Sequence, residues 1–183
     1  MADSIEQLLR EHAIFSLLDD RQIERMAGQL EPHSFSMGQD VVRQGDTGDS
    51  AWLIVSGKAR VLHRQGDGQR LTLANLRAGA LFGEQALLTD QIRNATVRAS
   101  EDLSALRIDY DIFQPLLDES PGLRQTCETV LGNTALQNFL KTSTVLRNIP
   151  SAQIRHLIDR LVPHTFEANH TFDLSQELSL IHI

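Results

Sequence analysis

Glu84 and Arg93 are the two residues whose types and spacing best suit a binding chemistry, and only a short loop separates them. The planar guanidinium of an arginine is a permanently charged donor that suits a phosphate. A carboxylate only accepts hydrogen bonds, so it suits a group rich in hydroxyls, such as a ribose. Gly83 precedes Glu84, and a glycine there lets backbone N–H groups face an anion at close range. The stretch therefore predicts a pocket for a sugar phosphate.

Two apolar segments flank these residues and are expected to position them. Ala80–Phe82 and Ala95–Val97 suit buried strand ends, and Gly83–Leu88 is expected to form a short amphipathic turn between them.

The stretch from Phe82 to Val97 resembles the phosphate-binding cassette of the cyclic-nucleotide-binding domain family. That family includes the bacterial catabolite activator protein, the regulatory subunit of protein kinase A and cyclic-nucleotide-gated channels. Its cassette reads F-G-E-x-A-L, a short loop and then R-x-A-T-V. This sequence carries FGEQAL at residues 82–87 and RNATV at residues 93–97.

The resemblance implies a role for each cassette residue. Arg93 would hold the cyclic phosphate, Glu84 would hold the ribose 2′-hydroxyl, and the amides around Gly83 to Ala86 would complete the phosphate site. Asn94 stands where some members carry a Thr or Ser that favours cGMP by bonding the guanine amino group. Asn could accept that bond or could face the phosphate, and we expect cAMP to be preferred over cGMP. The implied ligand-binding residues are Phe82, Gly83, Glu84, Gln85, Ala86, Arg93, Asn94 and Ala95.

Short apolar segments separated by turn signals fill the chain from about residue 34 to residue 108. Their regular spacing predicts a mainly β, α+β fold, in which about eight strands form an antiparallel sandwich or jelly-roll barrel with N-terminal and C-terminal helices. The turn Gln44-Gly45-Asp46, and later Ile54 and Gly57, also resemble the family pattern. The resemblance thus covers most of residues 15–118.

Helical spacing of apolar residues predicts helices on both sides of the strands. Asp20 is expected to cap a helix that Pro32 stops. After Pro121 a longer helix is expected, interrupted in its middle by Gly132-Asn133. In the family this C-terminal helix closes over the base, and Leu131, Leu136 and Phe139 are the residues expected to meet it here.

The segment after residue 141 repeats the beginning of the chain. Six residues recur without a gap, each 131 positions later, as in Pro32 and Pro163: Gln22, Ile23, Leu30, Pro32, His33 and Phe35 return as Gln153, Ile154, Leu161, Pro163, His164 and Phe166. We therefore expect a domain over residues 1–141 and the truncated start of a second copy over residues 142–183, which lacks a phosphate site. The apolar stripe of this second part should pack on the long helix or, as the favoured expectation, form a homodimer through residues 121–166.

Composition narrows the class of protein. The net charge of −7 argues against a nucleic-acid surface on this span, and no stretch is long and apolar enough to span a membrane. The N-terminus lacks a signal peptide, so a cytoplasmic location is expected. Cys127 is the sole cysteine, and the histidines show no metal spacing. With neither a nucleophile nor a paired general acid near Glu84 and Arg93, no enzyme activity, catalytic residue or cofactor is expected.

Three functions remain open. The first is a regulatory module that senses a cyclic nucleotide and transmits it by movement of the C-terminal helix. The second is a transcription regulator of the catabolite-activator type, although residues 142–183 show no basic recognition helix. The third is a degenerate scaffold domain that binds another protein rather than a nucleotide. In such a cassette Glu84 and Arg93 would form an ion pair with each other.

Overall fold

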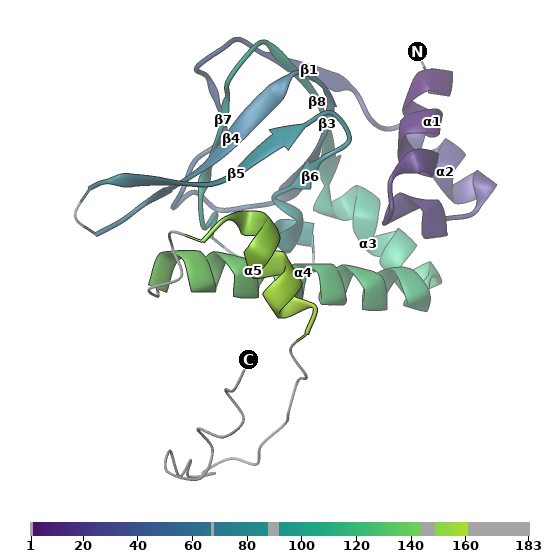
Figure 1. The fold of residues 1–183 in the computed structure, drawn as a ribbon. Coiled ribbons are helices and arrows are strands. Elements are labelled where there is room, and N and C mark those ends of the chain that lie inside the picture. The colour runs from purple at the N-terminus through teal and green to yellow at the C-terminus, as the bar shows by residue number, and fades with distance from the viewer. Residues whose placement is uncertain (1, 67, 88–91, 144–148, 161–183) are drawn as a thin grey trace, which may run out of the picture.

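The computed structural model describes residues 2–66, 68–87, 92–143 and 149–160. In this part of the chain two four-stranded antiparallel sheets face each other (Figure 1), with strand orders β1-β8-β3-β6 and β2-β7-β4-β5. The strands are β1 (Pro32–Phe35), β2 (Asp40–Val42), β3 (Ser50–Ser56), β4 (Lys58–Arg64), β5 (Arg70–Arg77), β6 (Leu81–Phe82), β7 (Thr96–Ala99) and β8 (Leu103–Asp109). The predicted antiparallel sandwich is confirmed.

Strand β3, inside the sheet β1-β8-β3-β6, is buried on both faces over residues 50–54. Successive strand residues point to opposite faces, so a strand covered on both sides must be apolar throughout. In β3, Trp52 and Ile54 pack between the two sheets, whereas Ala51 and Leu53 pack against the helices. This sheet is therefore the rigid centre on which the other elements rest.

Helices cover the outer face of that sheet (Figure 1). They are α1 (Ala2–Glu11), the 3-10 turn η1 (Phe15–Leu17), α2 (Asp20–Ala27), α3 (Tyr110–Glu119) and the first part of α4 (Pro121–Ser143), whereas α5 (Ser151–Ile158) packs on α4. Phe15 and Phe113 meet edge to face, with 6.0 Å between their ring centroids, in the centre of this apolar layer.

The ends of α2 differ from the prediction. Its N-cap is Asp19 rather than Asp20: the Asp19 carboxylate accepts from the Gln22 amide at 2.8 Å, and the Gln22 side chain accepts from the Asp19 amide at 3.0 Å. The helix ends at Ala27, so Pro32 does not stop it but begins β1.

The predicted interruption of the long helix is wrong, because α4 runs without a break from Pro121 to Ser143. A single glycine lowers helix propensity by about 1 kcal/mol, which tertiary packing readily offsets. A Cβ at Gly132 would meet nothing within 4 Å, so this glycine serves no close packing contact either.

α5 lies at the place that the repeat predicts. Its two ends, residues 151 and 158, each come 131 positions after the ends of α2, residues 20 and 27. Ile154 and Ile158 are buried, and α5 packs on α4, as Figure 1 also shows. Part of the apolar stripe is thus covered within one chain, and the homodimer remains a prediction. The repeated Pro163, His164 and Phe166 lie outside the described residues.

No helix of the described residues is both long enough and apolar enough to cross a membrane.

Gly57 joins β3 to β4, and replacing it tests how closely this turn packs against the segment at the start of β8. Its φ is +88°, and an added Cβ would collide with the carbonyl of Asp102 and lie 2.9 Å from the Cα of Leu103. Gly57→Ala should therefore carry both the left-handed backbone cost, about 1–2 kcal/mol, and an overpacking cost of about 1–3 kcal/mol. Urea denaturation measures the sum as a loss in the free energy of unfolding.

Gly38→Ala is the matched control. Gly38 has the same φ of +88°, yet a Cβ there meets nothing within 4 Å, so only the backbone cost applies. Equal losses for Gly38→Ala and Gly57→Ala would contradict the close approach of the β3–β4 turn to the segment before β8.

Candidate functional site

Arg93 lies just before β7, and its side chain is only 9% exposed. Its Nη1 donates to the carbonyl of Gly83 at 3.0 Å, and its Nη2 donates to the carbonyl of Ser50 at 2.6 Å. Burial lowers the pKa of the guanidinium, while the charges of Asp49 and Glu84 act in the opposite direction. Because a buried cation is costly unless it is hydrogen-bonded, these two carbonyls fix the guanidinium in one place.

The loop between β2 and β3 holds the backbone of Arg93. The Arg93 amide donates to the Asp46 carbonyl at 2.8 Å, and the Gly45 amide donates to the Arg93 carbonyl at 2.9 Å. Gly45 has a φ of +94°, which a glycine adopts without strain. The Gln44-Gly45-Asp46 turn therefore positions Arg93, although the two segments are far apart in the sequence.

Gly83 is required at its position for two reasons. Its φ is +71°, and an added Cβ would lie 2.5 Å from Nη1 of Arg93. No other residue type avoids both the backbone strain and this collision.

Glu84 opens the 3-10 turn η2 (Glu84–Leu87) that follows β6. Burial raises the pKa of its carboxyl, against the opposing effects of its own backbone amide and of the Arg93 charge. Both Glu84 and Arg93 belong to the described part of the chain, and no ion pair joins them there. The carboxylate and the guanidinium are thus close enough to affect each other's pKa, but each keeps its own position.

The remaining predicted residues surround these two. Phe82 is buried, and both Phe82 and Ala95 line the cavity that Glu84 and Arg93 also line. The Asn94 side-chain amide donates to the Gln85 side chain at 2.7 Å, which links the two sides of the cassette. Ala86 belongs to η2, and its side chain lies outside the described part of the structure.

A cavity of about 320 Å³ brings Gly83, Glu84 and Arg93 together. This volume falls at the lower end of the range for small-molecule sites, roughly 300–1,000 Å³. Its apolar lining comes from both sheets and includes Val42, Val61, Leu73, Leu81, Phe82 and Val97.

Helices close one side of the cavity with polar groups. They are Thr134, Gln137 and Asn138 of α4 and Arg155 of α5. The sequence predicted that α4 would contribute apolar side chains instead. Leu136 does not line the cavity, while the side chains of Leu131 and Phe139 lie outside the described set.

Sequence reasoning missed Ser50 and Arg155. Ser50 acts mainly through its backbone carbonyl, which any residue could supply, so no side-chain signal marks it. Arg155 reaches the cavity only because α5 packs on α4, a long-range contact that local patterns do not report.

The site can bind an anion next to a hydroxyl-bearing group. The guanidinium supplies charged donors, the carboxylate supplies acceptors, and the apolar walls can cover a ring. In the part of the chain that the structure describes, no cluster of His, Cys, Asp or Glu could hold a metal ion.

Comparison with known proteins agrees with this geometry. Residues 32–120 match the family model described as cyclic nucleotide-binding domain. A cAMP-dependent protein kinase regulatory subunit of Schizosaccharomyces pombe is 39% identical over 112 residues, which are 61% of this chain and 26% of that protein. A cGMP-dependent protein kinase of Eimeria tenella is 29% identical over 164 residues, which are 90% of this chain and 15% of that protein.

The fold also matches a solved structure, the sensor domain of the transcriptional regulator DNR from Pseudomonas aeruginosa. The TM-score is 0.67 at 20% identity, and the match covers 79% of this chain and 97% of the other. The chain therefore spans a small part of the kinase-related proteins but nearly all of an isolated sensor domain. Its sandwich, its cassette and the match over residues 32–120 make the chain similar to the cyclic nucleotide-binding domain family.

Proposed function

We propose that this chain is a non-catalytic regulatory module that binds a cyclic nucleotide, cAMP in preference to cGMP, and transmits binding through α4. The observation that carries the proposal is the single cavity that Arg93, Glu84 and α4 all line. Both a cAMP-dependent and a cGMP-dependent kinase protein are similar to the chain, which supports the ligand class.

Arg93 is proposed to bind the cyclic phosphate. Its Nη atoms are already anchored on Gly83 and Ser50, so the charged group is held in position before the ligand arrives. A guanidinium has five N–H donors, and it can bind a phosphate while keeping bonds to the protein. Such preorganisation lowers the ordering cost of binding.

Glu84 is proposed to accept hydrogen bonds from the ribose 2′-hydroxyl. Burial disfavours the charged form of this carboxyl, as its raised pKa indicates. A hydroxyl donor would stabilise the carboxylate and would relieve part of that cost. The site is therefore less stable empty than occupied, which favours ligand-dependent behaviour.

The base is proposed to lie toward the polar side of the cavity, near α4. Gln137 and Asn138 carry amides that both donate and accept hydrogen bonds, and Thr134 adds a hydroxyl. Because Asn94 already donates to Gln85, its amide nitrogen is engaged within the cassette. This bond supports the preference for cAMP that the sequence suggested, because a side chain held against Gln85 is less able to reach the guanine amino group.

α4 is proposed to carry the signal as one rigid rod. Its residues line the cavity, and α5 packs on it, so a shift of α4 would carry α5 along. A ligand shifts such an equilibrium only through its different affinities for the two positions of the helix. The proposed contacts with Gln137 and Asn138 supply that difference.

The scaffold alternative requires Glu84 and Arg93 to pair, and the contacts of Arg93 with backbone carbonyls argue against it. The alternative of a transcription regulator is supported only by the fold that the chain shares with the sensor domain of such a regulator.

Replacing Arg93 tests the phosphate contact. At about a hundred times its dissociation constant, cAMP should add about 2.7 kcal/mol to the stability of the parent, seen as a rise in Tm. Arg93→Leu should abolish the rise, because the phosphate loses its side-chain cation. Arg60→Leu is the matched control, since Arg60 is exposed and outside the cavity, and it should respond as the parent does. If Arg93→Leu responds like the parent, the assignment is wrong; a larger Tm shift with cGMP would overturn the preference.

Gly83→Ala tests whether the glycine serves Arg93 specifically. The added methyl should push the guanidinium out of place and weaken cAMP binding about tenfold or more, measured by calorimetric titration. Gly79→Ala is the control, because Gly79 also has a positive φ, +81°, but a Cβ there meets nothing within 4 Å. Equal affinities of the two variants would exclude the proposed support of Arg93 by Gly83.

Glu84→Gln separates affinity from stability. The amide is a poorer acceptor, so cAMP affinity should fall about tenfold, while the free energy of unfolding of the empty protein at pH 7 should rise because no charge is buried. The folded-state pKa of Glu84 is above the unfolded value, so the parent loses stability as pH rises between the two. The advantage of Glu84→Gln should thus vanish as pH falls below the pKa of an ordinary glutamate. Glu31→Gln, at an exposed site, should show neither effect; the same stability profile in both variants would contradict the account.

A further inference from the structure

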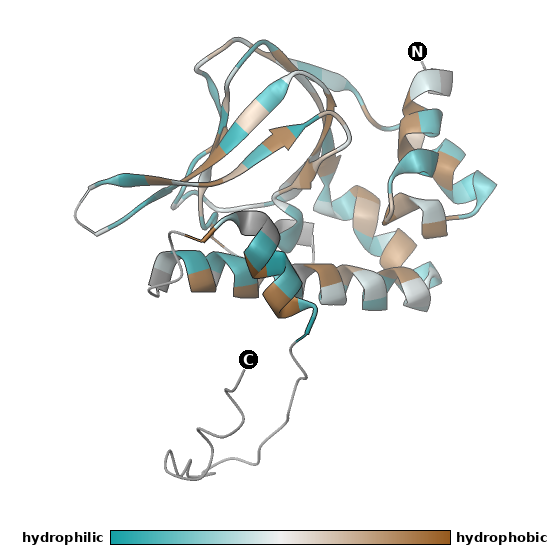
Figure 2. Cartoon of the chain, viewed as in Figure 1, coloured by the Kyte–Doolittle hydropathy of each residue, from teal (hydrophilic) through white to brown (hydrophobic). Residues whose placement is uncertain are grey.

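The outer face of the sheet β2-β7-β4-β5 carries a concentration of positive charge that the nucleotide site does not use. We name this surface the basic face. Figure 2 shows hydrophilic residues along β4 and β5. The basic face consists of Lys58, Arg60 and Arg64 of β4, Arg70 and Arg77 of β5, and Arg98 of β7.

The strand register places these cations in direct pairs. Three pairs of opposing residues join two cations each: Lys58 and Arg77, Arg60 and Arg98, and Arg64 and Arg70. Like charges directly opposite each other across a sheet are destabilising. The repulsion between these cations destabilises the isolated fold, and a partner of opposite charge would remove this repulsion.

Carboxylates of the same chain accompany two of the six cations. Arg98 donates to Asp40 at 2.6 and 3.0 Å, and Lys58 donates to Glu101 at 2.9 Å. The remaining four form no ion pair among the described residues: Arg60, Arg64, Arg70 and Arg77. All four are exposed. The chain has a net charge of −7, so these free cations stand out against an acidic molecule.

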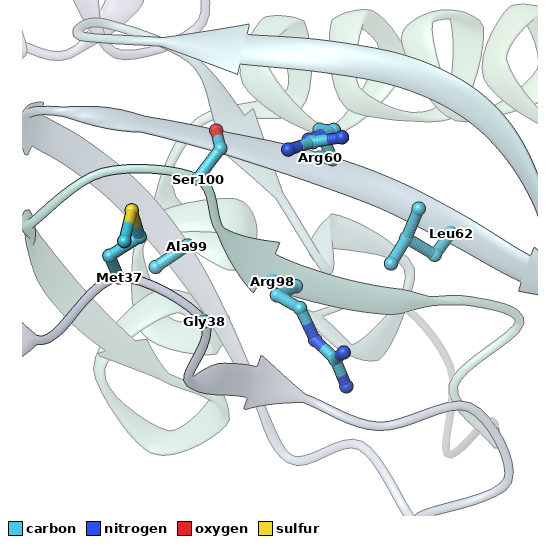
Figure 3. Close-up of a pocket in the computed structure, with 7 residues that line it drawn as sticks. All are labelled: Met37, Gly38, Arg60, Leu62, Arg98, Ala99 and Ser100. Carbon is cyan, nitrogen blue, oxygen red and sulfur yellow. The ribbon is translucent and has the colours of Figure 1, made fainter.

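A hollow of about 300 Å³ lies in this face (Figure 3). Arg60 and Leu62 of β4 and Arg98 of β7 line it, and Met37 from the turn before β2 forms its rim. Met37 is 71% exposed, so its apolar side chain is accessible to a partner. The hollow thus combines two cations with apolar surface from Met37 and Leu62.

The basic face is separate from the nucleotide cavity. Val61 and Val97, which are the sequence neighbours of Arg60 and Arg98, line the cavity. Because successive strand residues point to opposite faces, Arg60 and Arg98 point away from it. A partner on the basic face could therefore bind whether or not the cavity is occupied.

We propose that the basic face docks an acidic segment of a partner protein in extended conformation. Alternate residues of β4, which are Lys58, Arg60, Leu62 and Arg64, repeat at about 6.6–6.8 Å, which is also the repeat of alternate side chains in an extended peptide. A segment with carboxylates at alternate positions would meet Lys58, Arg60 and Arg64, and an apolar residue among them would meet Leu62. The hollow with its apolar lining fits a protein side chain better than a nucleic-acid backbone.

Fluorescein-labelled decaglutamate is the probe, and fluorescence anisotropy at low and at physiological salt is the measurement. The parent should bind it, more weakly as salt rises, because exposed charges are screened. The double variant Arg60→Glu/Arg77→Glu should bind about tenfold more weakly or worse, since it converts attraction into repulsion at two sites. Arg60→Gln/Arg77→Gln, which removes the charge without reversing it, should fall between the two.

Arg21→Glu/Arg160→Glu is the matched control, because it changes the net charge equally at exposed positions outside the basic face. It should bind as the parent does. Equal losses of decaglutamate affinity in Arg60→Glu/Arg77→Glu and in the control would mean that only net charge matters, and this would overturn the proposal. Absence of binding by the parent would also overturn it. A labelled single-stranded oligonucleotide that binds the parent more tightly than decaglutamate, with the same loss in the basic-face variant, would overturn the choice of a protein partner. The cAMP-induced rise in Tm should be unchanged in every variant, so this test is independent of the nucleotide site.

Discussion

The hydrogen bonds from the Arg93 guanidinium to the backbone carbonyls of Gly83 and Ser50 are the interaction on which the site depends. A cation in a largely apolar cavity is stable only where fixed acceptors surround it. Ser50 belongs to β3, the strand that is buried on both faces, and Gly83 follows β6, which pairs with β3. The most rigid part of the sandwich therefore carries the charged group, and the loop at Asp46 fixes its backbone.

In the proposed mechanism α4 is the element that responds to the ligand. The sheets and the cassette line one part of the cavity, and α4 with α5 lines another. The helical side is polar, so an empty cavity exposes amides and hydroxyls that water can satisfy, whereas a dry apolar lid would favour closure without ligand. The proposed movement of α4 thus relies on polar groups that water satisfies in the empty cavity and the ligand contacts in the occupied one.

Local patterns predicted the features that depend on residue type. Gly83, Glu84 and Arg93 were recognisable because few other residue types offer an unrestricted backbone, a carboxylate acceptor or a guanidinium donor. Alternating apolar residues between turn glycines indicated the strands. The capping residue of α2 was misplaced by one position, since Asp19 and Asp20 are equally good caps until the Gln22 side chain selects one. The unbroken α4 and the arrival of Arg155 at the cavity depend on packing between distant segments, which propensity does not report. The pairing of cations on the basic face likewise requires the register of β4 with β5 and β7.

Hydrogen–deuterium exchange of the full chain with and without cAMP tests the central claim most directly, because it reports the cassette and α4 in one experiment. The account predicts slower exchange of amides in residues 81–87 and also throughout Pro121–Ser143, the span of α4. Linear AMP at the same concentration should protect less, since its phosphate carries a different charge and shape from the cyclic diester. Protection confined to the cassette would contradict the transmission of binding through α4. No protection in either segment at saturating cAMP would contradict the site itself.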